Sequence, residues 1–297
     1  MTHSKPVNAS GTLIAGRWEL KEQIGSGAVA AVYRAVDTTD GSIRAIKLLD
    51  PSLTDEFGYR SRFVSEGKAM SRMHHPNIAR VFAYGEAENH LYTVMEYASG
   101  GTVLDHLNGG ERYRTLPAMR IIFEVLQALA VAHREGVIHR DVKPSNVLFS
   151  EDGGVRLADF GIARFLDDKV PHRTISGASM GTLGYMAPEQ GKNARHVGKT
   201  VDLYAAGATL YVMLVRKNPL SLAGADSNPD ILLKLPLPVR LLIGKACSYK
   251  VDGRYKTARK MAYDLAGARD VIGGARGEPR VADTWMAEFD RLTTGPL

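Results

Sequence analysis

The hydrophobic pattern of this chain changes once, near residues 96–101, and this change limits the possible folds more than any other feature. Before it, short runs such as 30–36 and 43–49 alternate apolar with polar side chains and end at glycine or aspartate, as strands do. One stretch, about 59–73, instead spaces its apolar residues along a helix face. After residue 101 the spacing is helical. The sequence therefore predicts an α+β chain with a small sheet-rich part and a larger helical part.

Three helical segments stand out in the second part. Residues 116–133 have amphipathic spacing, with Thr115 as the expected N-cap. Residues 203–215 are almost wholly apolar but too short to span a bilayer, so we expect a core helix. A last amphipathic segment follows residues 272–280, and we expect it to pack against its own lobe, with a partner helix as the alternative. The apolar positions are Ile121, Ile122, Val125, Leu129 and Ala132 in the first segment and Val281, Trp285, Phe289 and Leu292 in the last.

Composition excludes several classes of protein. With 297 residues, 44% hydrophobic and 24% charged, the chain can build a sizeable core. Its net charge of +6 comes from basic residues mixed with acids, so nucleic acid is not an expected partner. The single cysteine, Cys247, allows no internal disulfide and is expected to be buried and structural. The polar start and the lack of a long apolar run predict a cytoplasmic chain without a membrane anchor.

A glycine-rich turn joins two of the strand-like runs. Gly25 and Gly27 lack a Cβ atom, so backbone N–H groups there can approach a phosphate closely. Because a strand follows the turn, the pattern argues against a dinucleotide-binding or Walker-type loop, whereas an ordinary hairpin stays an alternative. Lys47 follows Gly27 by twenty residues in an apolar strand. If its ammonium points inward it needs an anion, for which Glu66 is the candidate; otherwise it reaches solvent.

Residues 137–149, VIHRDVKPSNVLF, crowd charge between two apolar ends. Asp141 has a cation on either side, and Asn146 leads into a short apolar strand. A second acid, Asp159, precedes Gly161, which permits a sharp turn. Asn146 and Asp159 offer oxygen ligands that suit Mg²⁺, which takes few protein ligands and shares its shell with phosphate oxygens. Phosphoryl transfer needs cations around the equatorial oxygens and one carboxylate to orient and deprotonate the attacking hydroxyl.

Taken in order, these motifs resemble those of the eukaryotic-type (Hanks-type) protein kinases, and most of all the bacterial serine/threonine kinases. The resemblance covers about residues 18–268 and includes GSGAVAAV, AIK, HPNI, VMEYASGG, HRDVKPSN, DFG, APE and DGRYKTARKMAYDL. It implies a bilobal fold with a small antiparallel-sheet N-lobe containing one helix and a larger helical C-lobe. It also implies transfer of the γ-phosphate of ATP to serine or threonine hydroxyls of protein substrates, with Mg²⁺. The expected segments are a flexible arm 1–16, an N-lobe 17–96, a C-lobe 97–272, and a linker with the C-terminal amphipathic segment 273–297.

The resemblance implies a role for each matching residue. Asp141 would be the catalytic base, and Lys143 would stabilise the transferring phosphoryl group. Lys47, paired with Glu66, would contact the α and β phosphates, and Asn146 and Asp159 would hold the metal ions. The expected ATP-binding residues are Ile24, Gly25, Gly27, Val32, Ala45, Lys47, Met95 as the gatekeeper, Glu96 and Ala98 through their backbones, and Leu148.

Thr182 would bridge the base and Lys143, and both residues indicate specificity for serine or threonine. Asp202 would anchor the backbone of the catalytic loop, and Glu189 and Arg254 would form a buried ion pair that holds the substrate-side loop. Arg140 would clamp a phosphate on the loop between residues 159 and 189. The autophosphorylation candidates on that loop are Thr174, Ser176 and Ser179, with plain loop hydroxyls as the alternative. His139 and Phe160 would belong to an apolar stack with Met70 and Val81, which makes His139 structural.

The sequence departs from the family pattern in two places. Ala30 replaces the usual third glycine of the turn, and the stretch 217–240 carries four prolines, so the helix expected after the core helix is truncated. Several alternatives stay open: a pseudokinase scaffold that binds nucleotide and partners without transfer, a phosphotransferase for small molecules, Mn²⁺ in place of Mg²⁺, and a homodimer formed through the N-lobe.

Overall fold

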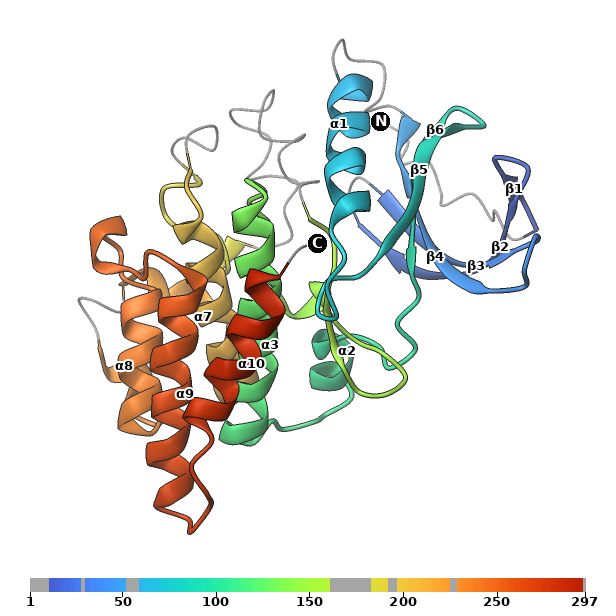
Figure 1. The fold of residues 1–297 in the computed structure, drawn as a ribbon. Coiled ribbons are helices and arrows are strands. Elements are labelled where there is room, and N and C mark those ends of the chain that lie inside the picture. Colours follow the sequence, from blue (N-terminus) through green and yellow to red (C-terminus); the bar gives the residue numbers. More distant parts are fainter. Residues whose placement is uncertain are drawn as a thin grey trace. The chain divides into compact units, whose positions relative to one another are not determined.

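The computed structural model describes residues 11–27, 30–51, 59–160, 183–191, 197–224 and 229–295, which fall into two compact units (Figure 1). The sheet unit comprises residues 1–74 and 79–99, and the helical unit comprises residues 75–78 and 100–297. The change of pattern near residues 96–101 therefore coincides with a boundary between two units.

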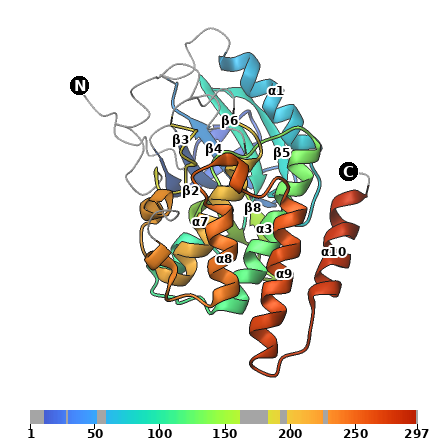
Figure 2. The same ribbon diagram turned by 90° about the vertical axis from the view of Figure 1, so that its left-hand side faces the viewer.

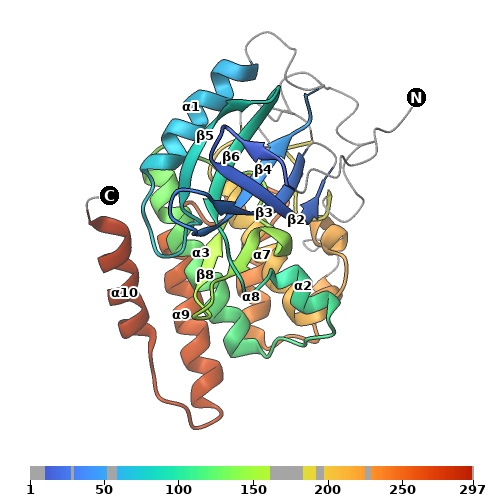
Figure 3. The ribbon, with the colours of Figure 1, turned by 90° about the vertical axis from the view of Figure 1, so that its right-hand side faces the viewer.

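The sheet unit contains one antiparallel sheet of six strands in the order β1-β2-β3-β4-β6-β5, with helix α1 beside β5 (Figure 3). Alternate residues face a core cluster that includes Tyr33, Ile46 and Val94, and within it the rings of Trp18 and Tyr92 lie 5.5 Å apart. The elements are β1 Leu13–Ile14, β2 Trp18–Ser26, β3 Ala30–Asp37, β4 Ile43–Leu49, α1 Tyr59–Arg72, β5 Val81–Ala87 and β6 His90–Glu96.

The first strand corrects one expectation. The flexible arm predicted over residues 1–16 does not extend to residue 16, because Leu13–Ile14 pairs with β2, and Ile14 is 2% exposed within the core cluster; residues 1–10 lie outside the described ranges. An apolar side chain that reaches the core stabilises even a strand of two residues, because burying it removes apolar surface from water.

The helical unit is built around α3, which packs against α7, α9 and α10. Figure 2 shows α9 between α8 and α10, and it contacts both. The apolar positions predicted along α3, from Ile121 to Ala132, are all buried, as are Cys247 and most residues of α7. The elements are α2 Val103–Asn108, α3 Thr115–Arg134, β7 Val147–Phe149, β8 Val155–Leu157, α7 Thr200–Val215, α8 Leu237–Ala246, α9 Ala258–Gly274, α10 Ala282–Thr294, and the 3-10 helices η2 Pro144–Asn146, η4 Pro219–Gly224, η5 Pro229–Leu232 and η6 Val251–Gly253.

Two findings concern α3. Within the described ranges it is the one helix whose length and apolar character would suffice to cross a membrane, and two thirds of that stretch is buried inside the unit. The prediction that Thr115 caps it is wrong, because Thr115 is its first residue and Arg114 is the N-cap. A guanidinium has no hydrogen-bond acceptor, so Arg114 cannot cap the first N–H groups.

The C-terminal segment packs against its own unit, as predicted. Phe289 is 1% exposed, and the rings of Trp285 and Phe289 lie 4.8 and 5.8 Å from that of Phe123 on α3. Arg120 donates two hydrogen bonds to Glu288, at 3.0 and 2.7 Å. Helix α10 is therefore joined to α3 by both apolar and ionic contacts.

The described residues between α7 and α8 form only the short 3-10 helices η4 and η5, which confirms the expected truncation. Residues 75–78 precede β5 in sequence but belong to the helical unit. Asn77 donates to the carbonyl of Val155, and Ile78 forms a bridge with Leu157. The HPNI motif is thus attached to the hairpin β7–β8.

Candidate functional site

In the sheet unit, five of the residues expected to bind ATP share the face opposite the core cluster. Gly25 lies opposite Val32, and Val32 lies opposite Lys47. Ala45, two residues before Lys47, lies opposite Met95. Since directly paired residues of antiparallel strands project to the same side, these five positions form one continuous surface. Lys47 is only 8% exposed on it.

The backbone conformation of the turn does not require glycine at either position. Neither has a positive φ, and a Cβ atom at Gly25 would meet Val32 at an ordinary distance of 3.5 Å. The Gly27 N–H donates to the Ala30 carbonyl at 2.8 Å, which closes the turn although Ala30 replaces a glycine. Because the two glycines have no side chains, another molecule can approach the backbone of the turn closely.

Helix α1 covers the same face as Lys47. Tyr84 on β5 lies opposite Thr93, and Thr93 lies opposite Lys47. A Cβ atom at Gly67 of α1 would stand 2.4 Å from the Tyr84 ring, so the helix backbone rests on this ring. The side chain of Glu66 lies outside the described residues, but Glu66 belongs to α1, the helix that packs on this face of the sheet.

The end of β6 carries three of the expected adenine contacts. Met95 is buried, and the Glu96 N–H donates to the carbonyl of Arg80 at 2.8 Å, which makes this N–H unavailable to a ligand. Ala98 follows in the same unit, and Ile24 is 45% exposed before the turn. Leu148 lies in the helical unit, where it forms a bridge with Thr102.

In the helical unit, residues 137–149, which we call the charged loop, bring their functional groups together. The Lys143 Nζ atom lies 2.8 Å from Oδ2 of Asp141, and the Asn146 Nδ2 atom donates to the same oxygen at 3.1 Å. A second bond from Nδ2, of 2.7 Å, goes to the Asp141 carbonyl. The carboxylate is therefore oriented from two sides, while 27% of its side-chain surface remains exposed to a substrate.

Asp202 on α7 holds this loop by its backbone. It is fully buried and accepts from the N–H groups of His139 at 2.9 Å and Arg140 at 2.7 Å, and from Nε2 of His133 at 2.7 Å. Arg140 has a φ of 67°, a left-handed conformation that costs a non-glycine residue about 1 to 2 kcal/mol. The carboxylate of Asp202 stabilises this strained turn, in agreement with the anchoring position predicted for it.

Both ring nitrogens of His139 are engaged. Nδ1 accepts from the Asp141 N–H at 3.2 Å, so the ring proton is assigned to Nε2, which donates to the Ala158 carbonyl at 2.8 Å. The ring is fully buried and lies 4.4 Å from that of Phe160. A histidine held in this way positions the loop, since neither nitrogen is free to move a proton.

The hairpin β7–β8 brings the two expected metal ligands together. The Ala158 N–H donates to the Asn146 carbonyl, so Asn146 and Asp159 lie at the same end of the hairpin. Because the Asn146 Nδ2 atom points to Asp141, its Oδ1 atom is the group left for a cation, with one hydroxyl from Ser145 at 3.2 Å. Asp159 has a φ of 65°, a strained conformation typical of functional positions. Two hard oxygen ligands fit a magnesium ion that arrives with phosphates.

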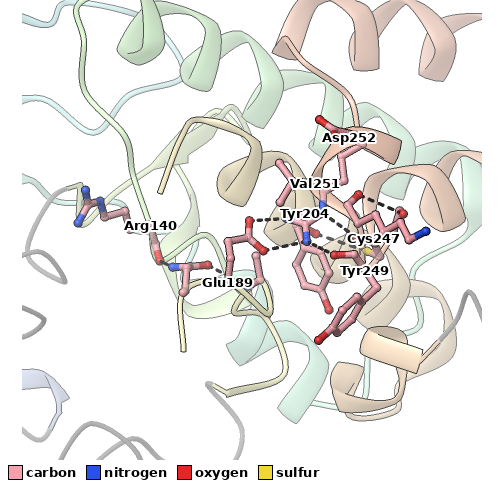
Figure 4. A network of polar contacts seen from close by, with 12 residues as sticks. Arg140, Glu189, Tyr204, Cys247, Tyr249, Val251 and Asp252 are labelled. Atoms are coloured by element: carbon pink, nitrogen blue, oxygen red, sulfur yellow. Dashed lines mark hydrogen bonds and ion pairs between the residues drawn. The ribbon is translucent and has the colours of Figure 1, made fainter. Parts of the chain in front are cut away.

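The predicted ion pair between Glu189 and Arg254 is present, with bonds of 2.6 and 2.9 Å. Only the arginine of this pair is fully buried, because its side chain has no exposed surface, whereas the side chain of Glu189 is 27% exposed. Arg254 also donates to the carbonyls of Ser248 and Tyr249. Figure 4 shows this network, which reaches Arg140 through a bond from Gln190 to the Arg140 carbonyl.

Some predicted residues lie outside the described ranges: Thr182, Thr174, Ser176, Ser179 and Gly161. Conversely, the structure adds two positions that the sequence did not suggest, His133 as the third partner of Asp202 and Gln190 as the partner of Arg140. His133 follows the apolar positions of α3 and Gln190 follows Glu189, but neither position carries a motif. The sequence indicates only that both residues are polar, His133 at the end of the predicted helix 116–133 and Gln190 beside the predicted ion-pair residue Glu189.

The protein kinase domain family matches residues 18–252. A protein of Bifidobacterium longum described as probable serine/threonine-protein kinase PknB is 37% identical over 290 residues, which are 89% of this chain and 41% of that protein. The chain thus spans about two fifths of the length of the curated relatives it matches.

Solved structures give the same result for the fold. The PknI kinase domain of Mycobacterium tuberculosis is 25% identical with a TM-score of 0.68, over 88% of this chain and 99% of that one. Rad53 in complex with AMP-PNP is 25% identical with a TM-score of 0.65, over 83% of this chain and 64% of that one.

Proposed function

Since the chain belongs to the protein kinase domain family, with the predicted antiparallel-sheet N-lobe and helical C-lobe, we propose that it transfers the γ-phosphate of ATP to serine and threonine hydroxyls of proteins. The observation that carries the proposal is the arrangement of Asp141, Lys143 and Asn146 around one carboxylate oxygen. Protein substrates are the partners that follow. A cytoplasmic location and pairing through the sheet unit stay predictions.

The helical unit would perform the transfer. Asp141 accepts the proton of the attacking hydroxyl, and the bonds from Lys143 and Asn146 keep its carboxylate in the orientation needed for this. Lys143 also neutralises the charge that develops on the transferring phosphoryl group. Asn146 and Asp159 would hold Mg²⁺, or Mn²⁺ in its place. When bound, such an ion neutralises the phosphate oxygens.

The sheet unit would bind the nucleotide. Lys47 offers its ammonium to the α and β phosphates from a surface where it is 8% exposed, so its charge is little screened by water. Glu66 would pair with it from α1. The apolar side chains of Val32, Ala45 and Met95 on the same face suit an adenine ring, together with Ile24 and the backbones of Glu96 and Ala98. Leu148, in the helical unit, stays a predicted adenine contact.

Regulation would use the loop before residue 183. Arg140 is the cation next to the catalytic base, and its backbone is fixed by Asp202 and Gln190, which suits a guanidinium that must bind one phosphate in a constant place. Thr174, Ser176 and Ser179 are the proposed acceptors of that phosphate, and Thr182 the proposed link between Asp141 and Lys143.

Two substitutions test the proposal. Asp141→Asn should keep nucleotide binding but lower kcat on a generic protein substrate by about 10² to 10⁴, the contribution of general base catalysis. Lys47→Met should weaken nucleotide binding, measured as a smaller thermal shift with ATP and Mg²⁺. The matched control is Lys68→Met, because Lys68 is exposed on α1.

The outcomes separate the alternatives. A pseudokinase scaffold would bind nucleotide without turnover in the unmodified chain. A small-molecule phosphotransferase would hydrolyse or transfer phosphate while leaving protein substrates unlabelled. Equal turnover by the Asp141→Asn variant and the unmodified chain would contradict the proposed base.

A further inference from the structure

A cavity of about 370 Å³ that is open to solvent lies in the helical unit, and no residue of the charged loop or of the hairpin β7–β8 lines it. It is formed where α3 and α8 begin and where α7 and α9 end, and its walls include Tyr113, Leu214 and Leu235. A volume of this size falls within the range of small-molecule sites. None of its wall residues belongs to the site proposed for phosphate transfer.

The cavity is lined by cations without acids. Arg114, Lys234 and Arg276 come from three separate segments and are all exposed at its rim, and all eight described residues that line it are neutral or basic. Within the described part of the chain, the side chains of these three residues form no ion pair, in contrast to most arginines of α3 and α9. Cations gathered around one pocket, with no acid among its lining residues, attract ions of the opposite sign.

The start of α3 adds hydrogen-bond donors to the same wall. Among the described residues no side chain caps this helix, because the N-cap position is taken by Arg114, which has no acceptor. Thr115, the first helical residue, lines the cavity, and the backbone N–H groups of the first turn of α3 have no side-chain cap among the described residues. An anion in the cavity would thus supply the acceptor that the sequence does not provide at this helix end.

We propose that this cavity binds a small organic anion, whose carboxylate or phosphate group meets Arg114, Lys234, Arg276 and the start of α3 and whose apolar part lies against Tyr113, Leu214 and Leu235. The site is independent of the proposed catalysis, since it needs neither nucleotide nor turnover. Carboxylate and phosphate ligands share this chemistry, and the experiment distinguishes them.

Titration calorimetry of the 297-residue chain with octanoate and with phenyl phosphate tests the proposal. We expect at least one of them to bind in the millimolar range or tighter, and octanol and phenol, which lack the anionic group, to bind at least about tenfold more weakly. The anion that binds identifies the ligand class. Absence of binding by both anions, or equal binding of each anion and its neutral counterpart, would overturn the proposal.

Variants locate the binding. Lys234→Gln and Arg276→Gln should each weaken binding of the anion by about fivefold, and the double variant by at least about twentyfold, because each removes a charged donor. The control is Lys199→Gln, which makes the same charge change at the opposite end of α7, about 22 Å from Leu214 along the helix. If Lys199→Gln weakens binding as much as the double variant, the anion is not held in this cavity and the proposal is wrong.

Discussion

At the scale of single residues, the helical unit depends on charged side chains that hold backbone rather than react. Asp202 accepts three hydrogen bonds while fully buried, and two of them fix the N–H groups of His139 and Arg140. A carboxylate can accept all three because it has two oxygens and no proton to donate. An amide at this position would present an N–H group to one of these donors.

Asp202→Asn should therefore disturb the loop that carries Asp141. We expect kcat to fall by about a hundredfold, since a shift of about 1 Å in a catalytic group has that effect, while the affinity for nucleotide changes little. Kinetics with a protein substrate and a separate nucleotide-binding titration measure the two quantities. Asp252→Asn is the control, because Asp252 is fully exposed and its ion pair with Lys256 lies at the surface. A parallel loss of nucleotide affinity would mean that the variant is misfolded.

At the scale of elements, the contact between α1 and β5 determines where the helix lies over the sheet. Gly67 allows the helix backbone to approach the Tyr84 ring, and no Cβ atom fits there without a shift, because it would come within 2.4 Å of the ring. Glycine is unfavourable inside a helix by up to about 1 kcal/mol relative to alanine, so its presence here has a packing reason.

Gly67→Ala tests this contact. Although alanine favours the helix, the clash with Tyr84 should lower the free energy of unfolding by about 1 to 3 kcal/mol, and nucleotide affinity should fall as α1 moves with Glu66. Urea unfolding measures the first effect. Gly267→Ala in α9 is the matched control, since nothing lies within 4 Å of its Cβ position, and it should be neutral or stabilising by up to about 1 kcal/mol. A stabilised Gly67→Ala variant would contradict the packing argument.

At the scale of the whole molecule, the buried His75 should make the free energy of unfolding depend on pH. Burial, with Arg134 and Arg156 nearby, lowers the pKa of His75 to about 4. Its Nδ1 atom accepts from the Asn77 N–H at 3.0 Å, which requires the unprotonated nitrogen. Because the unfolded chain binds this proton near pH 6.5, the contribution of His75 to stability is complete above pH 6.5 and is lost as the pH falls towards 4.

The free energy of unfolding of the unmodified chain should thus decrease between pH 6.5 and pH 4.5, by up to about 1.4 kcal/mol per pH unit from this one group. His75→Asn keeps an acceptor for the Asn77 N–H and should flatten the dependence. His74→Asn, which changes the exposed neighbouring histidine, should not. Urea unfolding at a series of pH values compares the three chains. The Arg17 guanidinium lowers the pKa of Asp37, so the effect of this carboxylate on stability appears only at a pH below 4.5. Equal slopes in all three chains would exclude His75 as the cause.

The local pattern of the sequence determined the helices and strands and the identity of the charged loop. Strand alternation and helical spacing depend on residues close together in the chain, and so does the group of charged residues that phosphate chemistry requires. Ile121 to Ala132 are buried as their spacing predicts, and Asp141, Lys143 and Asn146 meet because five residues of loop cannot separate them. Only the tertiary structure decided that His133 and Gln190 support this loop, that residues 75–78 belong with the hairpin β7–β8, and that Thr115 lines a cationic cavity instead of capping α3. Each of these depends on contacts between residues far apart in the chain, whose partners no local periodicity specifies.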